Sequence, residues 1–264
     1  MTLSLAISPC PNDTFVFHAL VHGLVPDAPA FDVTYADVDV TNTAVERGEF
    51  DIAKISYAAL PYVGDDYALL PSGGALGRGC GPLLLTRDDR DEPGEFDLRR
   101  ARLAIPGERT TAYLLFRRWA GDRAPARPEV VPFHEIMPGV ADGRFDAGLV
   151  IHEARFTYPR YGLRELADLG EWWESDTGLP IPLGAIVARR SAVAVDAAAE
   201  WIRASVRAAW ADPAASRDYV LAHAQEMESD VVDRHIALYV NPYTLDIGAD
   251  GRAAVDALLR PVSR

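Results

Sequence analysis

One histidine lies where a sheet-based protein would bind a ligand. His152 follows residues 147–151, an apolar run that is typical of a buried strand. In open parallel sheets, ligands bind beyond the carboxyl ends of the strands, so we expect His152 at a ligand site. An imidazole there titrates near neutrality and can take a proton from a substrate carbon or hydroxyl. A lone histidine is more often structural than catalytic, so position alone leaves both roles open.

Groups that favour an anion are expected at the same strand ends. Several loops lead directly into helix N-termini, where free N–H groups and the helix dipole attract carboxylates or phosphates. Hydroxyl and cationic side chains add donors, although a capping Ser or Thr is often only a cap. The sequence therefore predicts a small anionic ligand. The candidate donors are Lys54, Ser56, Thr110, Thr111 and Arg78.

Other catalytic motifs do not occur in the sequence. The loop 73–81 has five glycines in nine residues but lacks the Lys-Ser/Thr of a nucleotide P-loop, and no dinucleotide fingerprint or G-x-S-x-G elbow is present. The loop suits a hinge or a close backbone approach to a ligand. We expect no metal and no other cofactor.

Catalytic or metal-binding roles are not indicated for the other histidines or for Cys10, and structural or exposed roles are expected for His18 and His22. His18 and His22 share one predicted helix face, but no acidic or cysteine ligands accompany them at metal-site spacing. Cys10 lies between two prolines, which indicates a fixed turn. His223 and His235 fall in an alanine-rich tail with no motif around them.

The elements that must position these residues alternate between strand and helix. Strand-like runs at 3–7, 31–38 and 52–55 are followed by helix-like runs, and the pattern recurs at 102–105, 129–131 and 147–151. This order predicts an α/β fold of two lobes, with mostly parallel sheets flanked by helices and a ligand cleft between the lobes. We expect residues 1–87 and 183–264 to form a larger lobe and residues 88–182 a smaller one.

Two segments of the chain resemble each other. Residues 48–56 (GEFDIAKIS) and 143–152 (GRFDAGLVIH) each end a helix at glycine, turn through Phe-Asp and run into a buried strand. The similarity fits two lobes of like structure. A helix–Gly–strand connection is also common in α/β proteins, so the pattern does not decide between these explanations.

The charge and cysteine content of the chain limit the classes of partner and the compartment that we expect. The chain carries 26 basic and 39 acidic residues and a formal net charge of −13, which disfavours nucleic acid and anionic membrane surfaces. Two cysteines are too few for a disulfide framework, which indicates a reducing compartment. No signal peptide or membrane-length apolar run is visible, so we expect a cytoplasmic protein. The sequence does not indicate an oligomeric state.

Seven motifs span nearly the whole chain. They are 8–15 (SPCPNDTF), 54–57 (KISY), 73–82 (GGALGRGCGP), 105–112 (IPGERTTA), 151–158 (IHEARFTY), 179–184 (LPIPLG) and 239–241 (YVN). Together these motifs resemble 1,4-dihydroxy-6-naphthoate synthases of the futalosine route to menaquinone, with no departure at the functional positions.

The resemblance implies a fold like that of type II periplasmic binding proteins, used for catalysis without a cofactor. It implies a lyase that acts on cyclic dehypoxanthine futalosine, with His152 as proton acceptor. The implied substrate contacts are Lys54, Ile55, Ser56, Thr110 and Thr111, with Asp13, Asn42 and Arg78 ranked behind them. Two alternatives stay open: chorismate dehydratase of the same pathway, and a binding protein that only carries a small carboxylate.

Overall fold

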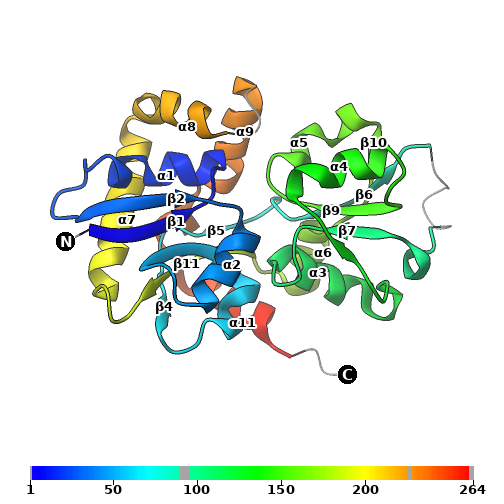
Figure 1. The fold of residues 1–264 in the computed structure, drawn as a ribbon, viewed down its shortest axis with the longest axis horizontal. Coiled ribbons are helices and arrows are strands. Elements are labelled where there is room, and N and C mark those ends of the chain that lie inside the picture. Colours follow the sequence, from blue (N-terminus) through cyan, green and yellow to red (C-terminus); the bar gives the residue numbers. More distant parts are fainter. Residues whose placement is uncertain (1, 90–95, 225–227, 262–264) are drawn as a thin grey trace. The chain divides into compact units, whose positions relative to one another are not determined.

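The computed structural model describes residues 2–89, 96–224 and 228–261, and it divides the chain into two compact units. Unit 1 comprises the described residues of Met1–Gly77 and Pro182–Arg260, and unit 2 those of Arg78–Ile181 together with Pro261. Both units contain a sheet flanked by helices, so the predicted α/β class is confirmed (Figure 1). Met1 and residues 90–95, 225–227 and 262–264, which the predicted lobes include, lie outside the described residues.

The sheet of unit 1 combines parallel and antiparallel strands. Its order is β2-β1-β3-β11-β4, with β5 paired to β11. β1 runs parallel to β2 and β3, whereas β11 runs antiparallel to β3 and β4. The strands are β1 (Thr2–Ile7), β2 (Ala30–Tyr35), β3 (Ile52–Ser56), β4 (Tyr67–Leu69), β5 (Ala75–Gly77) and β11 (Ile181–Arg189).

Helices cover both faces of this sheet (Figure 1). Leu5, Ile7 and Ile186 from the strands pack with Phe17 of α1 and Ile202 of α7 in one apolar core, because alternate strand residues share a face. The helices of unit 1 are α1 (Pro11–Val21), α2 (Val38–Glu46), α7 (Val195–Ala211), α8 (Arg217–His223), α9 (Ser229–Tyr239), α10 (Pro242–Leu245) and α11 (Gly248–Leu259).

Unit 2 is built on a five-stranded sheet of order β10-β6-β9-β7-β8. β7 runs parallel to β8 and β9, whereas β6 runs antiparallel to β9 and β10. Its strands are β6 (Leu83–Arg87), β7 (Leu103–Ile105), β8 (Glu129–Val130), β9 (Ala147–Val150) and β10 (Leu163–Asp168), and its α-helices are α3 (Thr111–Ala120), α4 (Phe133–Ala141), α5 (Ala154–Thr157) and α6 (Leu169–Thr177).

The two units repeat one topology. The segments β1-α1-β2-α2-β3 and β7-α3-β8-α4-β9 both place the first strand between the second and the third, and an antiparallel strand then follows the third. The two Phe-Asp segments lead into the corresponding strands β3 and β9. The similarity seen in the sequence therefore marks equivalent positions. Unit 2 begins at Arg78, so β6 lies in it, whereas the boundary expected from the sequence falls just after β6.

Short 3-10 helices complete the structure: η1 (Tyr57–Tyr62), η2 (Leu98–Arg100), η3 (Gly121–Arg123), η4 (Tyr158–Tyr161) and η5 (Pro213–Ser216). Within the described ranges, none of the helices is both long and apolar enough to span a bilayer.

Candidate functional site

Lys54 lies at the centre of a buried polar cluster in unit 1. The chain has 25 arginines but a single lysine, and this lysine is on β3, where every residue is buried. Its Nζ atom forms an ion pair with the carboxylate of Asp13, and the two side chains are 4% and 2% exposed. A buried ion pair is costly to desolvate unless hydrogen bonds satisfy the remaining lone pairs. Such a pair in the middle of a core therefore needs explanation.

Both oxygens of the Asp13 carboxylate accept hydrogen bonds. Its Oδ2 accepts hydrogen bonds from the Ser8 hydroxyl at 2.6 Å and the Ser8 backbone N–H at 3.2 Å. Its Oδ1 accepts one from the Asn12 amide at 2.8 Å in addition to Lys54. Ser8 follows β1 and Asp13 lies in the first turn of α1, so the β1–α1 turn builds this cradle.

Ammonium donors remain available at Lys54. A lysine ammonium has three N–H donors, and in the part of the chain that the structure describes Asp13 is its one hydrogen-bond partner. Two donors on a nearly buried cation are thus left for another group. This arrangement suits a carboxylate ligand.

Ser56 is fixed by α2, while Ile55 belongs to the core. The Ser56 N–H donates to Asn42 Oδ1 at 2.8 Å, and Asn42 Nδ2 donates to the Ser56 hydroxyl at 3.1 Å. Alternation along the strand puts Lys54 and Ser56 on one face and Ile55 on the other. The predicted contacts Lys54 and Ser56 therefore share a face, whereas the fully buried Ile55 side chain lies on the opposite face.

Tyr57 brings a buried hydroxyl to the end of the same segment. The side chain is completely buried, and its hydroxyl has no hydrogen-bond partner among the described residues. Burial raises the pKa of the phenol, so the hydroxyl stays protonated and can donate. A Cβ built on Gly74 would lie 3.2 Å from this hydroxyl and 2.8 Å from the Gly184 carbonyl oxygen. The Tyr57 hydroxyl is therefore packed closely beside Gly74 and keeps a donor that is unused among the described residues.

His152 has an uncommon backbone conformation in unit 2. It comes two residues after β9 and before α5, and its φ of 55° places a non-glycine residue in the left-handed region. Such strain costs about 1–3 kcal/mol and tends to cluster at functional sites. The half-buried imidazole packs edge-on against Phe133, with ring centroids 5.4 Å apart. The predicted position after a strand is therefore observed, and the backbone adds a signal that the sequence did not give.

Thr110 and Thr111 form the start of α3. Thr110 is the N-cap residue: its hydroxyl accepts from the Tyr113 N–H at 3.2 Å and donates to the Gly107 carbonyl at 2.8 Å. Thr111 is the first residue of the helix, and both threonines are buried. The Thr110 hydroxyl thus works as a cap, while the helix N-terminus offers the favourable dipole.

Arg78 is half-exposed and contacts the end of α6. Its guanidinium donates to the Gly178 carbonyl at 2.9 Å and pairs with Glu174, which also accepts from the Gly79 N–H at 2.6 Å. These contacts tie the glycine-rich loop to the end of α6. Burial raises the pKa of the nearby Cys80 thiol to about 12, so that thiol is not a nucleophile at neutral pH.

Three glycines of the loop, Gly73, Gly74 and Gly81, are required by the protein's own packing. A Cβ on Gly73 would lie 2.8 Å from Ile202, and one on Gly81 only 2.2 Å from the Gly170 nitrogen. Each contact is made within the glycine's own unit, unit 1 for Gly73 and unit 2 for Gly81.

His18 and His22 belong to an aromatic cluster. Their ring centroids are 4.4 Å apart, and both rings contact Tyr219 of α8. The His22 Nδ1 atom lies 2.8 Å from the His18 carbonyl oxygen. Packing explains why the two rings share a helix face.

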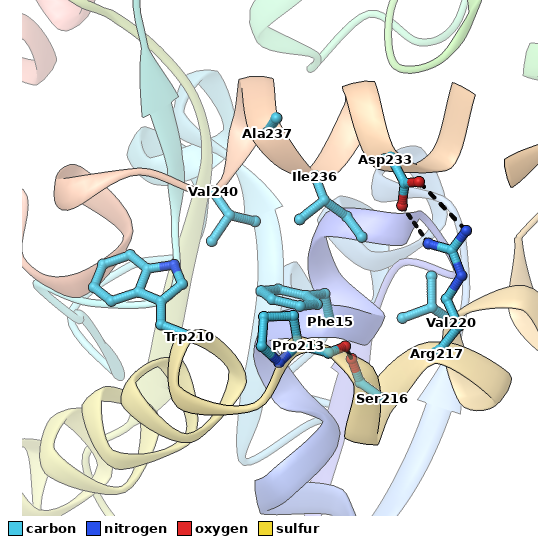
Figure 2. A pocket seen from close by; sticks show the side chains of 10 residues that line it. All are labelled: Phe15, Trp210, Pro213, Ser216, Arg217, Val220, Asp233, Ile236, Ala237 and Val240. Atoms are coloured by element: carbon cyan, nitrogen blue, oxygen red, sulfur yellow. Dashed lines mark hydrogen bonds and ion pairs between the residues drawn. The ribbon is translucent and has the colours of Figure 1, made fainter. Parts of the chain in front are cut away.

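An apolar pocket of about 310 Å³ opens elsewhere in unit 1 (Figure 2). Phe15, Trp210, Ile236 and Val240 line it, and the Arg217–Asp233 ion pair lies at one edge. None of the predicted site residues lines this pocket. Ile236 nevertheless follows directly after His235, whose ring Nε2 lies 3.0 Å from the Asn12 side-chain oxygen.

These features define an α/β protein of the periplasmic-binding-protein fold. The structure matches a Candida albicans protein described as having that generic fold, with a TM-score of 0.69, 9% identity, and coverage of 100% of this chain and 92% of the other. The alkanesulfonate-binding protein SsuA from Xanthomonas axonopodis also gives a TM-score of 0.69, at 16% identity and 89% and 83% coverage. At such identities the likeness concerns the fold alone.

The chain belongs to the menaquinone biosynthesis family, whose model matches residues 3–264. It is 64% identical over 263 residues to 1,4-dihydroxy-6-naphthoate synthase of Streptomyces coelicolor, covering 98% of this chain and 92% of the relative. The synthase of Thermus thermophilus is 46% identical over 258 residues, with 97% and 92% coverage. Protein AF1704 from Archaeoglobus fulgidus has a TM-score of 0.88, 30% identity, and 97% and 95% coverage. The expected family, and the expectation of an enzyme of menaquinone biosynthesis, are confirmed.

Proposed function

We propose that the protein is a 1,4-dihydroxy-6-naphthoate synthase that converts cyclic dehypoxanthine futalosine into 1,4-dihydroxy-6-naphthoate, with His152 as general base. The observation that carries this proposal is the identity of 64% to a synthase over nearly the whole of both chains. The strained backbone of His152 supports its assignment as the base, since such conformations persist where function requires them.

In the proposed reaction, the imidazole of His152 takes a proton from a hydroxyl of the sugar-derived part of the substrate. The oxygen's electron pair forms a carbonyl as the carbon–carbon bond to the ring breaks, and the sugar-derived part leaves with that carbonyl. The pair from the broken bond enters the ring system, which becomes aromatic. The step is redox-neutral, so it needs no external oxidant, reductant or redox cofactor.

The remaining residues of the proposal bind the substrate. Lys54 offers two donors beyond its pair with Asp13, and we assign it to the substrate carboxylate or to an oxyanion that develops during the reaction. Ser56 and the start of α3 at Thr110 and Thr111 add hydroxyl and backbone donors. Ile55 would contact the substrate through its backbone, because its side chain lies in the core.

The test is product formation from purified protein and cyclic dehypoxanthine futalosine without added cofactor. His152→Asn is the informative variant, because asparagine tolerates the left-handed conformation and leaves the backbone in place. We expect turnover to fall about 10²–10⁴-fold with substrate binding largely intact. His134→Asn, an exposed position on α4, serves as the matched control and should retain full activity. Near-normal turnover by His152→Asn would refute the base assignment.

Two outcomes would replace the proposal. Turnover of chorismate, with none of cyclic dehypoxanthine futalosine, would make the protein a chorismate dehydratase. Tight binding of a small carboxylate with no turnover of either substrate would make it a binding protein.

We further propose a cytoplasmic location without nucleic-acid or membrane partners, supported by the two buried free thiols and the net charge of −13.

A further inference from the structure

A hydrogen-bonded chain connects α9 to the single lysine of the protein. The ring of His235 is completely buried, and its Nε2 lies 3.0 Å from Asn12 Oδ1. The Nδ2 of Asn12 donates to Asp13 Oδ1 at 2.8 Å, and Asp13 pairs with Lys54. Residues 223 positions apart in the sequence are thus joined through side chains alone.

The direction of each hydrogen bond in this chain is fixed by chemistry. Because the Asn12 nitrogen donates to the carboxylate, the Asn12 oxygen must face His235 and can only accept. The Nε2 of His235 therefore carries a hydrogen. If the Asn12 amide flipped, its oxygen would face the Asp13 carboxylate, and two acceptors would meet in a buried site. The His235 N–H thus selects the amide orientation that supports Asp13.

The shape of the site explains why a lysine occupies position 54. The Lys54 stem crosses Gly184 of β11, where a Cβ would lie only 2.5 Å from Lys54 Cε. A compact ammonium on a slender stem fits this passage, whereas the planar guanidinium of arginine is larger and differently shaped. In a chain that otherwise uses arginine for every cation, the retained lysine indicates that the site needs this geometry.

We infer that His235 is a positioning residue for the active site: through Asn12 and Asp13 it holds the Lys54 ammonium in place for the substrate carboxylate. The inference rests on the proposed function for the role of Lys54 toward substrate. The chain of hydrogen bonds from His235 to Lys54 can be tested without any substrate.

The test uses the fact that the chain has one lysine. Protein labelled with ¹³C,¹⁵N-lysine gives a single Cε–Hε correlation, which reports directly on the surroundings of the Lys54 ammonium. His235→Leu removes the donor, and His235→Gln supplies an amide N–H near the position of Nε2. We expect His235→Leu to shift or broaden the Lys54 signal and His235→Gln to keep it close to the wild-type position.

A control variant separates positioning from packing. Ile236 is the next residue of α9 and points into the apolar pocket (Figure 2). Ile236→Ala should lower the stability but leave the Lys54 signal unchanged. Asn12→Ala breaks the same chain from α1 and keeps His235, so it tests the inference even if His235→Leu fails to fold. It should reproduce the signal change expected for His235→Leu.

Kinetics provide the second readout. Since an ill-positioned ammonium weakens the hold on the carboxylate in both ground and transition states, His235→Leu should raise KM about 10-fold with a smaller change in kcat. His235→Gln should restore KM. An unchanged Lys54 signal in both His235→Leu and Asn12→Ala, or equal effects of Leu and Gln at position 235, would overturn the inference. If the wild-type protein forms no product while the signal changes as expected, the proposed function fails and the hydrogen-bonded chain stands.

Discussion

The backbone of Gly81 lies directly against the backbone of Gly170, and a Cβ at Gly81 would come within 2.3 Å of the Gly170 Cα. The guanidinium of Arg155 closes the same junction, since it donates to the Gly81 carbonyl at 2.9 Å and pairs with Asp168. Asp168 in turn caps the N-terminus of α6. Arg155 therefore holds the residues before β6 against the start of α6.

We expect Gly81→Ala to destabilise unit 2 strongly. The added methyl group meets backbone atoms, which cannot rotate away, so overpacking should cost at least about 1–3 kcal/mol of unfolding free energy. Gly79→Asn is the matched control, because Gly79 has a φ of 65° with open space around its Cβ position, and asparagine tolerates that conformation. Urea unfolding measures both. An equal denaturation midpoint for Gly81→Ala and wild type would contradict the packing argument.

The sequence predicted those parts of the fold and site that depend on local patterns. The apolar runs at β3 and β9, the glycine that ends each preceding helix and the cap at Thr110 all act over a few residues, so they can be recognised without tertiary information. The position of His152 after β9 follows from the same patterns together with the sheet rule.

Features that depend on distant contacts were missed or misplaced. His235 has no motif around it because its partner Asn12 is 223 residues away. Asp13 ranked low, although it holds Lys54, since a carboxylate in a first helical turn is normally a capping residue. The contact of Arg78 with Glu174 likewise joins residues that are distant in the sequence. The sequence itself does contain one indication that position 54 is special, because its lysine is the single one in a chain with 25 arginines.

Tyr57→Phe is expected to leave the stability unchanged or to raise it by up to about 1 kcal/mol. The hydroxyl has no partner among the described residues, so its removal ends a desolvation cost and breaks no hydrogen bond. Tyr67→Phe provides the contrast, because the Tyr67 hydroxyl donates to the Phe50 carbonyl at 2.6 Å and its loss should cost about 1 kcal/mol. Chemical denaturation compares the stability of the two variants. A loss of stability in Tyr57→Phe like that in Tyr67→Phe would refute the expectation.

The same variant tests contact with substrate. If the Tyr57 hydroxyl contacts bound substrate, KM rises in Tyr57→Phe although stability does not fall.

The His18–His22 pair should make unit 1 less stable in mild acid. Partial burial, and next the charge on His22, lower the pKa of His18 below its usual 6.5. The folded state therefore binds this proton less readily than the unfolded state, so the stability is fully present above pH 6.5 and is lost as the pH falls below it. The charge on His22 is the smaller cause, and like charges four residues apart on a helix cost about 0.2–0.5 kcal/mol.

The measurement is urea unfolding at pH 7.5 and at pH 5.5. His18→Gln should show a smaller loss of stability between the two pH values than wild type. His22→Gln should reduce the loss by less, because burial of His18 is the larger cause. Identical pH dependence in wild type and His18→Gln would rule out this account.

Gly184→Ala tests the fit of Lys54 across β11. The new Cβ would lie 2.5 Å from Lys54 Cε and 3.6 Å from both Cδ and Nζ, so either the stem or the strand must move. We expect the unfolding free energy to fall by about 1–3 kcal/mol. We also expect kcat/KM to fall about 10-fold or more, since a shift of the ammonium weakens an interaction worth more than 1.4 kcal/mol.

A double-mutant cycle identifies the cause of the lost stability. In a Lys54→Ala background the obstructing stem is absent, so Gly184→Ala should cost little additional stability, and the two substitutions should be strongly non-additive. A cost for Gly184→Ala that is the same in both backgrounds would show that the methyl group disturbs β11 itself, and the fit of the lysine would not be what keeps glycine at this position.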